Sequence, residues 1–335
     1  MEYTTLGKTG LKISRIGFGG IPIQKVDVPT VRALMERLVQ EGVNYIDSAR
    51  GYTVSEAYLG EALDGIRDRF VLATKSMART KDAMEKDIEI SLTNFRTDYI
   101  DLYQIHNPSL ADLEKVCAPG GALEALLEAK AAGKIGHIGV TAHMASVFER
   151  ALELDWVETV MFPYNIVETQ GEALMRRAAE RNVGFVCMKP LAGGAIEDAS
   201  LALRFIAQNR DVSVVIPGMY SLEEIAQNIA AASDTAPLTQ AEAEKIEAIR
   251  ADLGTQFCRR CNYCQPCTAG IGISGIFVLE CYLQRYGLGD WAKQRYAGMA
   301  KKAGDCIGCG VCEARCPYQL PIRQMLARCK EEFGA

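Results

Sequence analysis

The chain has 335 residues, of which 49% are hydrophobic and 24% are charged, and its net charge is −5 at pH 7. This composition is ordinary for a globular protein, and the length accommodates one barrel-sized domain with a small appendage. The negative charge argues against a surface for nucleic acid or an anionic membrane. No apolar run approaches the roughly 18 residues of a membrane span, and Met1–Gly10 holds no apolar signal core. The sequence therefore predicts a cytoplasmic protein.

The chain opens with a predicted hairpin, whose strands are Tyr3–Leu6 and Leu11–Ser14. Short apolar strands then alternate with helices of 3.6-residue periodicity, as expected for a parallel sheet that is buried on both faces. The predicted strands are Arg15–Gly19, Asn44–Ser48, Phe70–Lys75, Tyr99–His106, Ile135–Thr141, Thr159–Tyr164, Gly184–Pro190 and Val212–Pro217. The predicted helices are Val31–Gln40, Ser55–Leu63, Lys81–Phe95, Leu123–Ala132, Ser146–Leu154, Glu172–Arg181, Ala199–Gln208 and Leu222–Ala232.

This alternation predicts an α/β fold, a (β/α)8 TIM barrel over residues 1–236. An open doubly wound sheet is the alternative, but no G-x-G-x-x-G motif opens a first helix. Residues 237–335 then form a C-terminal extension. It begins with a predicted helix, Leu238–Leu253, in which Thr239 and Glu242 suit a capping box. Helical patches in Ile273–Gly304 and a last helix at Ile322–Phe333 predict a mainly helical, ferredoxin-like domain.

Eight of the twelve cysteines fall in two runs of this extension. The downstream run has the pattern C-x2-C-x2-C-x3-C-P, by which bacterial ferredoxins hold a [4Fe–4S] cluster, and the last cysteine normally ligates the other cluster. The extension is therefore predicted to bind two [4Fe–4S] clusters. The ligands of one would be Cys258, Cys261, Cys264 and Cys316. Those of the other would be Cys306, Cys309, Cys312 and Cys267.

Two other interpretations of the cysteines are weaker. Structural zinc also uses paired C-x2-C motifs, but zinc ribbons seldom contain the triple run followed by Cys-Pro. Disulfides are disfavoured because cysteines spaced this closely rarely bridge within one run. Cys267 is the least secure ligand, because Thr268 rather than proline follows it and its spacing is x2 rather than x3.

Four polar residues lie at or just beyond predicted strand ends, where barrels of this kind place their active sites. Taken singly, Asp47, Tyr52, Lys75 and His106 have structural explanations, such as a cap or a satisfied core histidine. Together they fit one mechanism, in which the tyrosine hydroxyl becomes a usable acid beside a lysine cation. Asp47 would fix Lys75 by an ion pair, and His106 would orient a carbonyl or share the proton.

These motifs resemble the aldo-keto reductases over roughly residues 1–235. The resemblance rests on three stretches: Tyr45–Tyr52, Ala73–Lys75 and Asp98–His106. With its cysteine-rich tail, the chain is similar to the iron–sulfur branch of that family, which is found mainly in anaerobic bacteria and archaea. The resemblance implies a (β/α)8 barrel, Tyr52 as proton donor, a small carbonyl or alcohol substrate, and NAD(P)(H) as the usual hydride source.

The resemblance also contains departures at the nicotinamide. In the family, a Ser-Asn pair after the fifth strand and a Gln on the sixth hold the nicotinamide amide, where this chain has Thr141-Ala142 and Met161. A stacking Tyr on the seventh strand corresponds to Met188. Binding of a nicotinamide ring is therefore expected to be weaker than in the family.

The contacts to the 2′-phosphate of NADP differ as well. Lys-Ser and a later Arg of many members correspond to Gly218-Met219 and Glu224, and Glu224 would repel a phosphate. The candidate nucleotide contacts that remain are Thr141, Gly193, Gly194 and Asn228. The two glycines are explained about equally well by a simple turn, and Asn228 by an amide on a helix surface, as by nucleotide binding. NADPH binding is predicted to be weak or absent, with NADH or another ligand left open.

The residues leave three functions open. In the first, the chain reduces a carbonyl with electrons that its clusters carry from a ferredoxin-like partner. A bare cluster cannot deliver hydride, and the sequence has no flavin motif. Alternatively, the chain is an NAD(P)H-dependent carbonyl reductase with structural clusters. The third function is a non-catalytic electron-transfer protein on a barrel scaffold.

Overall fold

The structure is a computed structural model that describes residues 1–334, and it divides into two compact units. The barrel unit comprises Met1–Asn165, Thr169–Pro190 and Ala199–Pro237. The C-terminal unit comprises Leu238 onward together with Ile166–Glu168 and Leu191–Asp198, two short segments that follow barrel strands in the sequence.

The barrel unit is built on eight parallel strands that pair in sequence order. They are β3 (Phe18–Gly19), β4 (Tyr45–Asp47), β5 (Val71–Ser76), β6 (Ile100–Ile105), β7 (Ile135–Thr141), β8 (Thr159–Pro163), β9 (Gly184–Met188) and β10 (Val214–Val215). Parallel bridges from Ile16 to Val215 and from Gly19 to Gly218 join the first strand to the last, so the sheet closes. The predicted (β/α)8 barrel is confirmed. The strands predicted at Arg15–Gly19 and Val212–Pro217 are shorter, because isolated bridges replace the regular ladder at this seam.

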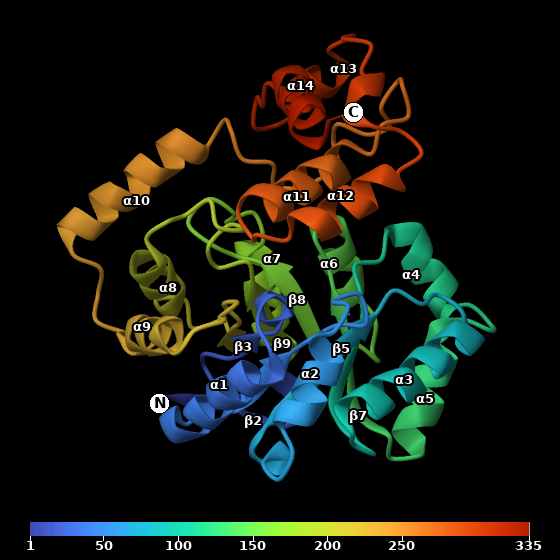
Figure 1. The fold of residues 1–335 in the computed structure, drawn as a ribbon, viewed down its shortest axis with the longest axis vertical. Helices are drawn as coiled ribbons and strands as arrows, with labels where there is room; N and C mark the ends of the chain where they lie inside the picture. Colours follow the sequence, from blue (N-terminus) through green and yellow to red (C-terminus); the bar gives the residue numbers. More distant parts are fainter. Residues whose placement is uncertain (335) are drawn as a thin grey trace. The chain divides into compact units, whose positions relative to one another are not determined.

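Helices surround these strands (Figure 1). They are α1 (Val28–Glu41), α2 (Ser55–Ala62), α3 (Lys81–Phe95), α4 (Leu110–Cys117), α5 (Ala122–Ala131), α6 (Ala145–Leu152), α7 (Glu172–Glu180), α8 (Ala199–Ala207) and α9 (Leu222–Ser233). Their apolar faces cover the outside of the sheet and form the larger core. A smaller core fills the barrel interior, to which the hairpin of β1 (Tyr3–Thr5) and β2 (Lys12–Ser14) contributes Leu6 and Ile13.

Helix α4 is absent from the helices predicted from the sequence. Ser109 caps the helix by accepting the Asp112 N–H at 3.1 Å, and the Asp112 carboxylate accepts the Ser109 N–H at 3.1 Å. Leu113 and Val116 are buried. The S-x-x-D capping pattern was legible in the sequence and was overlooked.

The C-terminal unit is mainly helical. Its helices are α10 (Gln240–Leu253), α11 (Ile273–Gln284), α12 (Gly289–Ala297), α13 (Val311–Ala314) and α14 (Ile322–Phe333). The predicted capping box of Thr239 and Glu242 is present at the start of α10. Residues of α11, α12 and α14 form one apolar core, against which several cysteines pack. Among residues 1–334, no helix combines the length and apolar character needed to cross a membrane.

Candidate active site and cysteine clusters

A buried ion pair lies at the carboxyl ends of two adjacent strands. Asp47 ends β4, and Lys75 lies near the end of β5, so their side chains meet at the rim of the barrel. The Lys75 ammonium donates to Asp47 Oδ1 and to the Ser48 carbonyl oxygen at 2.7 Å. Gln104 Nε2 of β6 donates to Asp47 Oδ2 at 3.1 Å. The sequence analysis assigned no role to Gln104, although an amide near the carboxyl end of a buried strand was a signal.

Burial and pairing act against each other in this ion pair. Both side chains are about 2% exposed, so loss of solvation raises the pKa of Asp47 and lowers the pKa of Lys75. The attraction between the two charges opposes both shifts. With Gln104 and Ser48 satisfying the remaining polar atoms, the protein holds a desolvated cation at a fixed position.

Tyr52 and His106 complete the group of four predicted side chains. Lys75 Nζ lies 4.9 Å from the centroid of the Tyr52 ring. The Tyr52 and His106 rings are 6.2 Å apart and nearly perpendicular, at 89°. The structure therefore brings all four residues together, from the ends of β4, β5 and β6 and from the loop before α2.

The electrostatics of Tyr52 differ from the expectation. Burial raises the pKa of Tyr52, and the negative charge of Asp47 raises it further. Asp47 also pairs with Lys75, whose ammonium lies over the Tyr52 ring. The phenol stays protonated and able to donate, and it loses its proton only to an acceptor on which negative charge develops.

The loop that carries Tyr52 is tied to the barrel by a second buried carboxylate, which the sequence reasoning did not single out. The Arg50 N–H donates to the Lys75 carbonyl oxygen at 3.0 Å, and Arg50 Nη1 donates to Glu56 Oε2 at 2.6 Å. Glu56 is about 1% exposed and also accepts the hydroxyls of Thr74 at 2.7 Å and Ser91 at 2.9 Å. These contacts fix the backbone on either side of Tyr52.

The residues at the expected nicotinamide positions contact other parts of the barrel. Thr141 Oγ1 accepts the Asn107 N–H at 2.9 Å. Met161 is buried in the barrel interior, and Met188 packs against the same interior core. Apolar thioethers thus occupy the positions at which the family resemblance implies polar or aromatic contacts.

The other candidate nucleotide contacts fall in different units. Asn228 is buried on α9 of the barrel unit, and Glu224 in the first turn of that helix accepts the Tyr220 N–H at 2.7 Å. Gly193 and Gly194 belong to the C-terminal unit, where the Gly193 carbonyl oxygen accepts the Cys281 thiol at 3.0 Å.

Three cysteines of the downstream run and the last cysteine of the upstream run line one cavity of the C-terminal unit. Its lining includes the thiols predicted for one cluster, Cys267, Cys306, Cys309 and Cys312. Arg323 lies at the same cavity and pairs with Glu313 at 2.8 Å. Four sulfurs around a shared space is the donor set that a cubane cluster requires.

The upstream cysteines are close enough for their charges to interact. Burial raises the pKa of Cys264 to about 12, and the neighbouring thiols of Cys258 and Cys261 raise it as well. Cys316 packs at the edge of the same apolar core. Thiolates are the ligating form, so the positive charge of iron is what would hold these groups deprotonated. Within residues 1–334, no three His, Cys, Asp or Glu side chains are arranged to hold a single metal ion.

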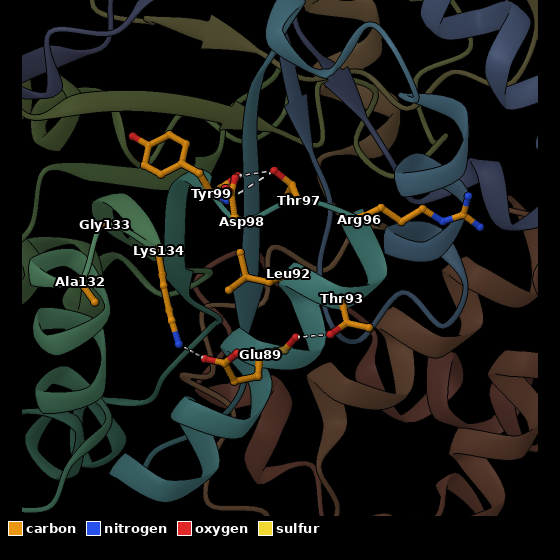
Figure 2. A pocket seen from close by; sticks show the side chains of 10 residues that line it. All are labelled: Glu89, Leu92, Thr93, Arg96, Thr97, Asp98, Tyr99, Ala132, Gly133 and Lys134. Atoms are coloured by element: carbon orange, nitrogen blue, oxygen red, sulfur yellow. Dashed lines mark hydrogen bonds and ion pairs between the residues drawn. The ribbon is translucent and has the colours of Figure 1, made fainter.

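A hollow at the other end of the strands is separate from these sites (Figure 2). It is lined by residues of α3 and of the segments that lead into β6 and β7. Figure 2 shows the Lys134 side chain directed at Glu89, with which it pairs at 2.5 Å. Arg96 points away from Lys134 and pairs with Glu61 at 2.8 Å. Both cations are neutralised, and the hollow lies at the amino ends of β6 and β7, away from the four polar side chains.

Comparisons with known proteins agree with this geometry. The family described as "Aldo/keto reductase family" matches residues 15–200, and the "4Fe-4S dicluster domain" matches residues 257–321. L-galactose dehydrogenase of Arabidopsis thaliana is 25% identical over 303 residues, covering 74% of this chain and 94% of that protein. Aldo-keto reductase YhdN of Bacillus subtilis is 31% identical over 228 residues, covering 59% of this chain and 66% of that protein.

The solved structures give the same result. The holo form of aldo-keto reductase AKR11C1 from Bacillus halodurans superposes with a TM-score of 0.65 at 25% identity, covering 74% of this chain and 96% of that one. An aldo-keto reductase from Pseudomonas aeruginosa, described as putative, superposes with a TM-score of 0.63 at 26% identity, covering 69% of this chain and 94% of that one.

Proposed function

Because this chain belongs to the aldo/keto reductase family and is an oxidoreductase, we propose that it reduces the carbonyl group of a small substrate or oxidises the corresponding alcohol. The observation that carries the proposal is the grouping of Asp47, Tyr52, Lys75 and His106 at one rim of the barrel.

Each of the four side chains has a distinct task. Tyr52 donates its phenolic proton to the carbonyl oxygen as negative charge develops there. Lys75, held by Asp47, stabilises the tyrosinate that remains. His106, with its ring 6.2 Å from that of Tyr52, orients the carbonyl oxygen toward the phenol. In the oxidation direction, Tyr52 takes the proton back.

We propose that the electrons reach the substrate through iron–sulfur clusters. The match to a 4Fe-4S dicluster domain supports such clusters, and the upstream and downstream cysteines would hold them. When bound, two clusters would supply two electrons singly, and a ferredoxin-like protein would replenish them. Carbonyl reduction also consumes two protons, one from Tyr52 and one from a second donor. The apolar side chains of Met161 and Met188 support a source of electrons other than a firmly held nicotinamide.

The second candidate is an NAD(P)H-dependent carbonyl reductase in which the clusters only stabilise the C-terminal unit. The barrel fold favours it, since the family normally uses NADP(H). One relative carries the name "Aldo-keto reductase yakc [NADP(+)]" and is 28% identical over 212 residues. In this case hydride would come from the nicotinamide, with Tyr52 in the same role.

Anaerobic assays on the full chain separate these functions. The probe substrate is benzaldehyde, offered with reduced methyl viologen, NADH or NADPH in turn, and the benzyl alcohol formed is quantified. Turnover with the viologen alone supports the cluster route, and turnover with only a pyridine nucleotide supports the second candidate. Tyr52→Phe should lower the rate by about 10²–10⁴-fold with either donor, whereas the control Tyr58→Phe on α2 should not. If Tyr52→Phe matches the unaltered protein, a non-catalytic electron-transfer role replaces both.

A further inference from the structure

The two cysteine runs share one backbone pattern. In each, the second residue after the first cysteine and the first residue after the second cysteine have positive φ angles. These are Arg260 at +58° and Asn262 at +63° upstream, and Gly308 at +71° and Gly310 at +73° downstream. Glycine adopts this conformation freely, and asparagine does so more readily than most residues. Arg260 is the exception, at a cost of about 1–2 kcal/mol.

The Arg260 side chain is buried in contacts within the C-terminal unit. Its side chain is 10% exposed, and Nη2 pairs with the Glu168 carboxylate, which is itself fully buried. Nη1 donates to the Cys258 carbonyl oxygen at 3.2 Å, and the guanidinium lies 5.3 Å from the centroid of the Phe257 ring. A strained backbone that supports a buried ion pair indicates a position selected for its side chain.

One donor of Arg260 is left over. Nε is buried, and no group among the described residues accepts its hydrogen. The guanidinium charge interacts with the Cys258 thiol. A cluster ligated by Cys258 presents sulfur acceptors, so this orphaned N–H fits such a group.

The downstream run has a different electrostatic environment. Gly308, at the position equivalent to Arg260, carries no side chain. A counterpart cation is Arg323, which lies at the cavity lined by these cysteines and whose charge interacts with Cys306 and Cys312. Its side chain is 51% exposed, and Nε and Nη2 both contact the Glu313 carboxylate at 2.8 Å. Both cations are paired with a carboxylate, but solvent also screens the exposed Arg323, whereas little solvent reaches the buried Arg260.

We propose that Arg260 raises the reduction potential of the cluster bound by the upstream run above that of the downstream cluster, with Glu168 limiting the effect. Reduction adds one negative charge, and a buried cation beside Cys258 stabilises that charge. Glu168 pairs with the guanidinium and partly cancels its charge. Electrons that enter the pair therefore reside on the upstream cluster. The inference rests on the proposed function only in requiring that both clusters are present.

The test is a potentiometric titration of the full-length holoprotein, followed by electron paramagnetic resonance, with dithionite supplying one electron to each cluster. Arg260→Gly reproduces the backbone of the downstream run and relieves the left-handed strain, so the loop should still form. One midpoint potential should fall, with the reduced-to-oxidised ratio at fixed potential dropping at least about tenfold, or about 59 mV. Glu168→Gln should move the same midpoint upward, because the guanidinium is then unopposed.

Two controls make the result decisive. Arg323→Gln, beside the other run, should change either ratio by less than about threefold, since its charge is already screened. The double variant Arg260→Gly/Glu168→Gln avoids a buried unpaired carboxylate, and its midpoint should lie below that of the unaltered protein. Repeating the titration in Cys309→Ala, which lacks the downstream cluster, assigns the shifted signal.

Shifts of the same sign in Arg260→Gly and Glu168→Gln, or no shift in either, would overturn the proposal. Loss of half the iron from both variants would also overturn it, because the pair would then serve assembly. The titration requires no carbonyl substrate. Failure of the proposed carbonyl chemistry therefore leaves this result intact, and failure of the potential shift leaves that chemistry intact.

Discussion

The polar group of the barrel and the cysteines of the C-terminal unit differ in where their partners come from. Asp47 and Lys75 neutralise each other, and Gln104 and Ser48 satisfy their remaining atoms, so every partner belongs to the protein. The cysteines line a cavity or face one another, and burial raises the pKa of Cys264 to about 12. The partner that would hold these thiols is iron, which comes from outside the chain. The barrel site should therefore be organised without a cofactor, whereas the cysteine loops should depend on iron.

The largest effect on stability should come from breaking the internal pair of the barrel. Lys75→Met leaves the Asp47 carboxylate buried and unpaired, which should cost about 3–5 kcal/mol of unfolding free energy. Urea unfolding followed by circular dichroism measures this. The matched control is Lys134→Met at the exposed pair with Glu89, where the loss should stay below about 1 kcal/mol. Equal losses in the two variants would show that the buried pair contributes no more than a surface one.

The loop that carries Tyr52 offers a second test of internal organisation. Glu56→Gln keeps the shape but removes the charge that Arg50, Thr74 and Ser91 contact, and it should cost about 1.5–3 kcal/mol. The rate of carbonyl reduction should fall with it, while the iron content stays the same. An unchanged rate would show that the position of Tyr52 does not depend on this carboxylate.

The opposite dependence should hold for the cysteines. Cys309→Ala should remove one cluster and about half of the iron while leaving the barrel folded, with its unfolding free energy altered by less than about 0.5 kcal/mol. Iron analysis and far-ultraviolet circular dichroism test both parts. Cys117→Ala, an exposed thiol on α4, is the control and should retain all the iron. A fully unfolded Cys309→Ala protein would mean that the barrel needs the cluster.

The smallest expected effect is a pH dependence confined to the barrel. Burial by itself would raise the pKa of Glu158, but hydrogen bonds from His137 at 2.7 Å, Lys130 at 2.7 Å and the Ile138 N–H at 2.9 Å lower it to about 2. A carboxyl whose pKa is lower in the folded state stabilises the fold above its unfolded pKa, here near 4.5. That stability should be lost as the pH falls from about 4.5 toward 2. The urea concentration at the unfolding midpoint should therefore change less with pH in Glu158→Gln than in the unaltered protein.

Local patterns were enough for much of this protein. The period of the apolar residues predicted the alternating strands and helices, including the bounds of β7, α3 and α14. Cysteine spacing predicted an iron–sulfur domain. The positions of Asp47, Lys75 and His106 at the carboxyl ends of three predicted strands indicated that their side chains would lie close together. These inferences succeed because hydrophobic periodicity and ligand spacing act over a few residues.

Other features depend on the closed barrel and on contacts between distant segments. The Gln104 amide reaches Asp47 only because β6 lies beside β5 in register, and Glu168 meets Arg260 across 92 residues of sequence. The direction of the pKa shift of Tyr52 could not be predicted from the sequence either. It depends on how deeply the phenol is buried and on its distance from the charge of Asp47. The sequence by itself determined which chemical groups are present and which local elements carry them. Only the tertiary structure decided which groups pair, because desolvation and charge interactions are set by distances in space.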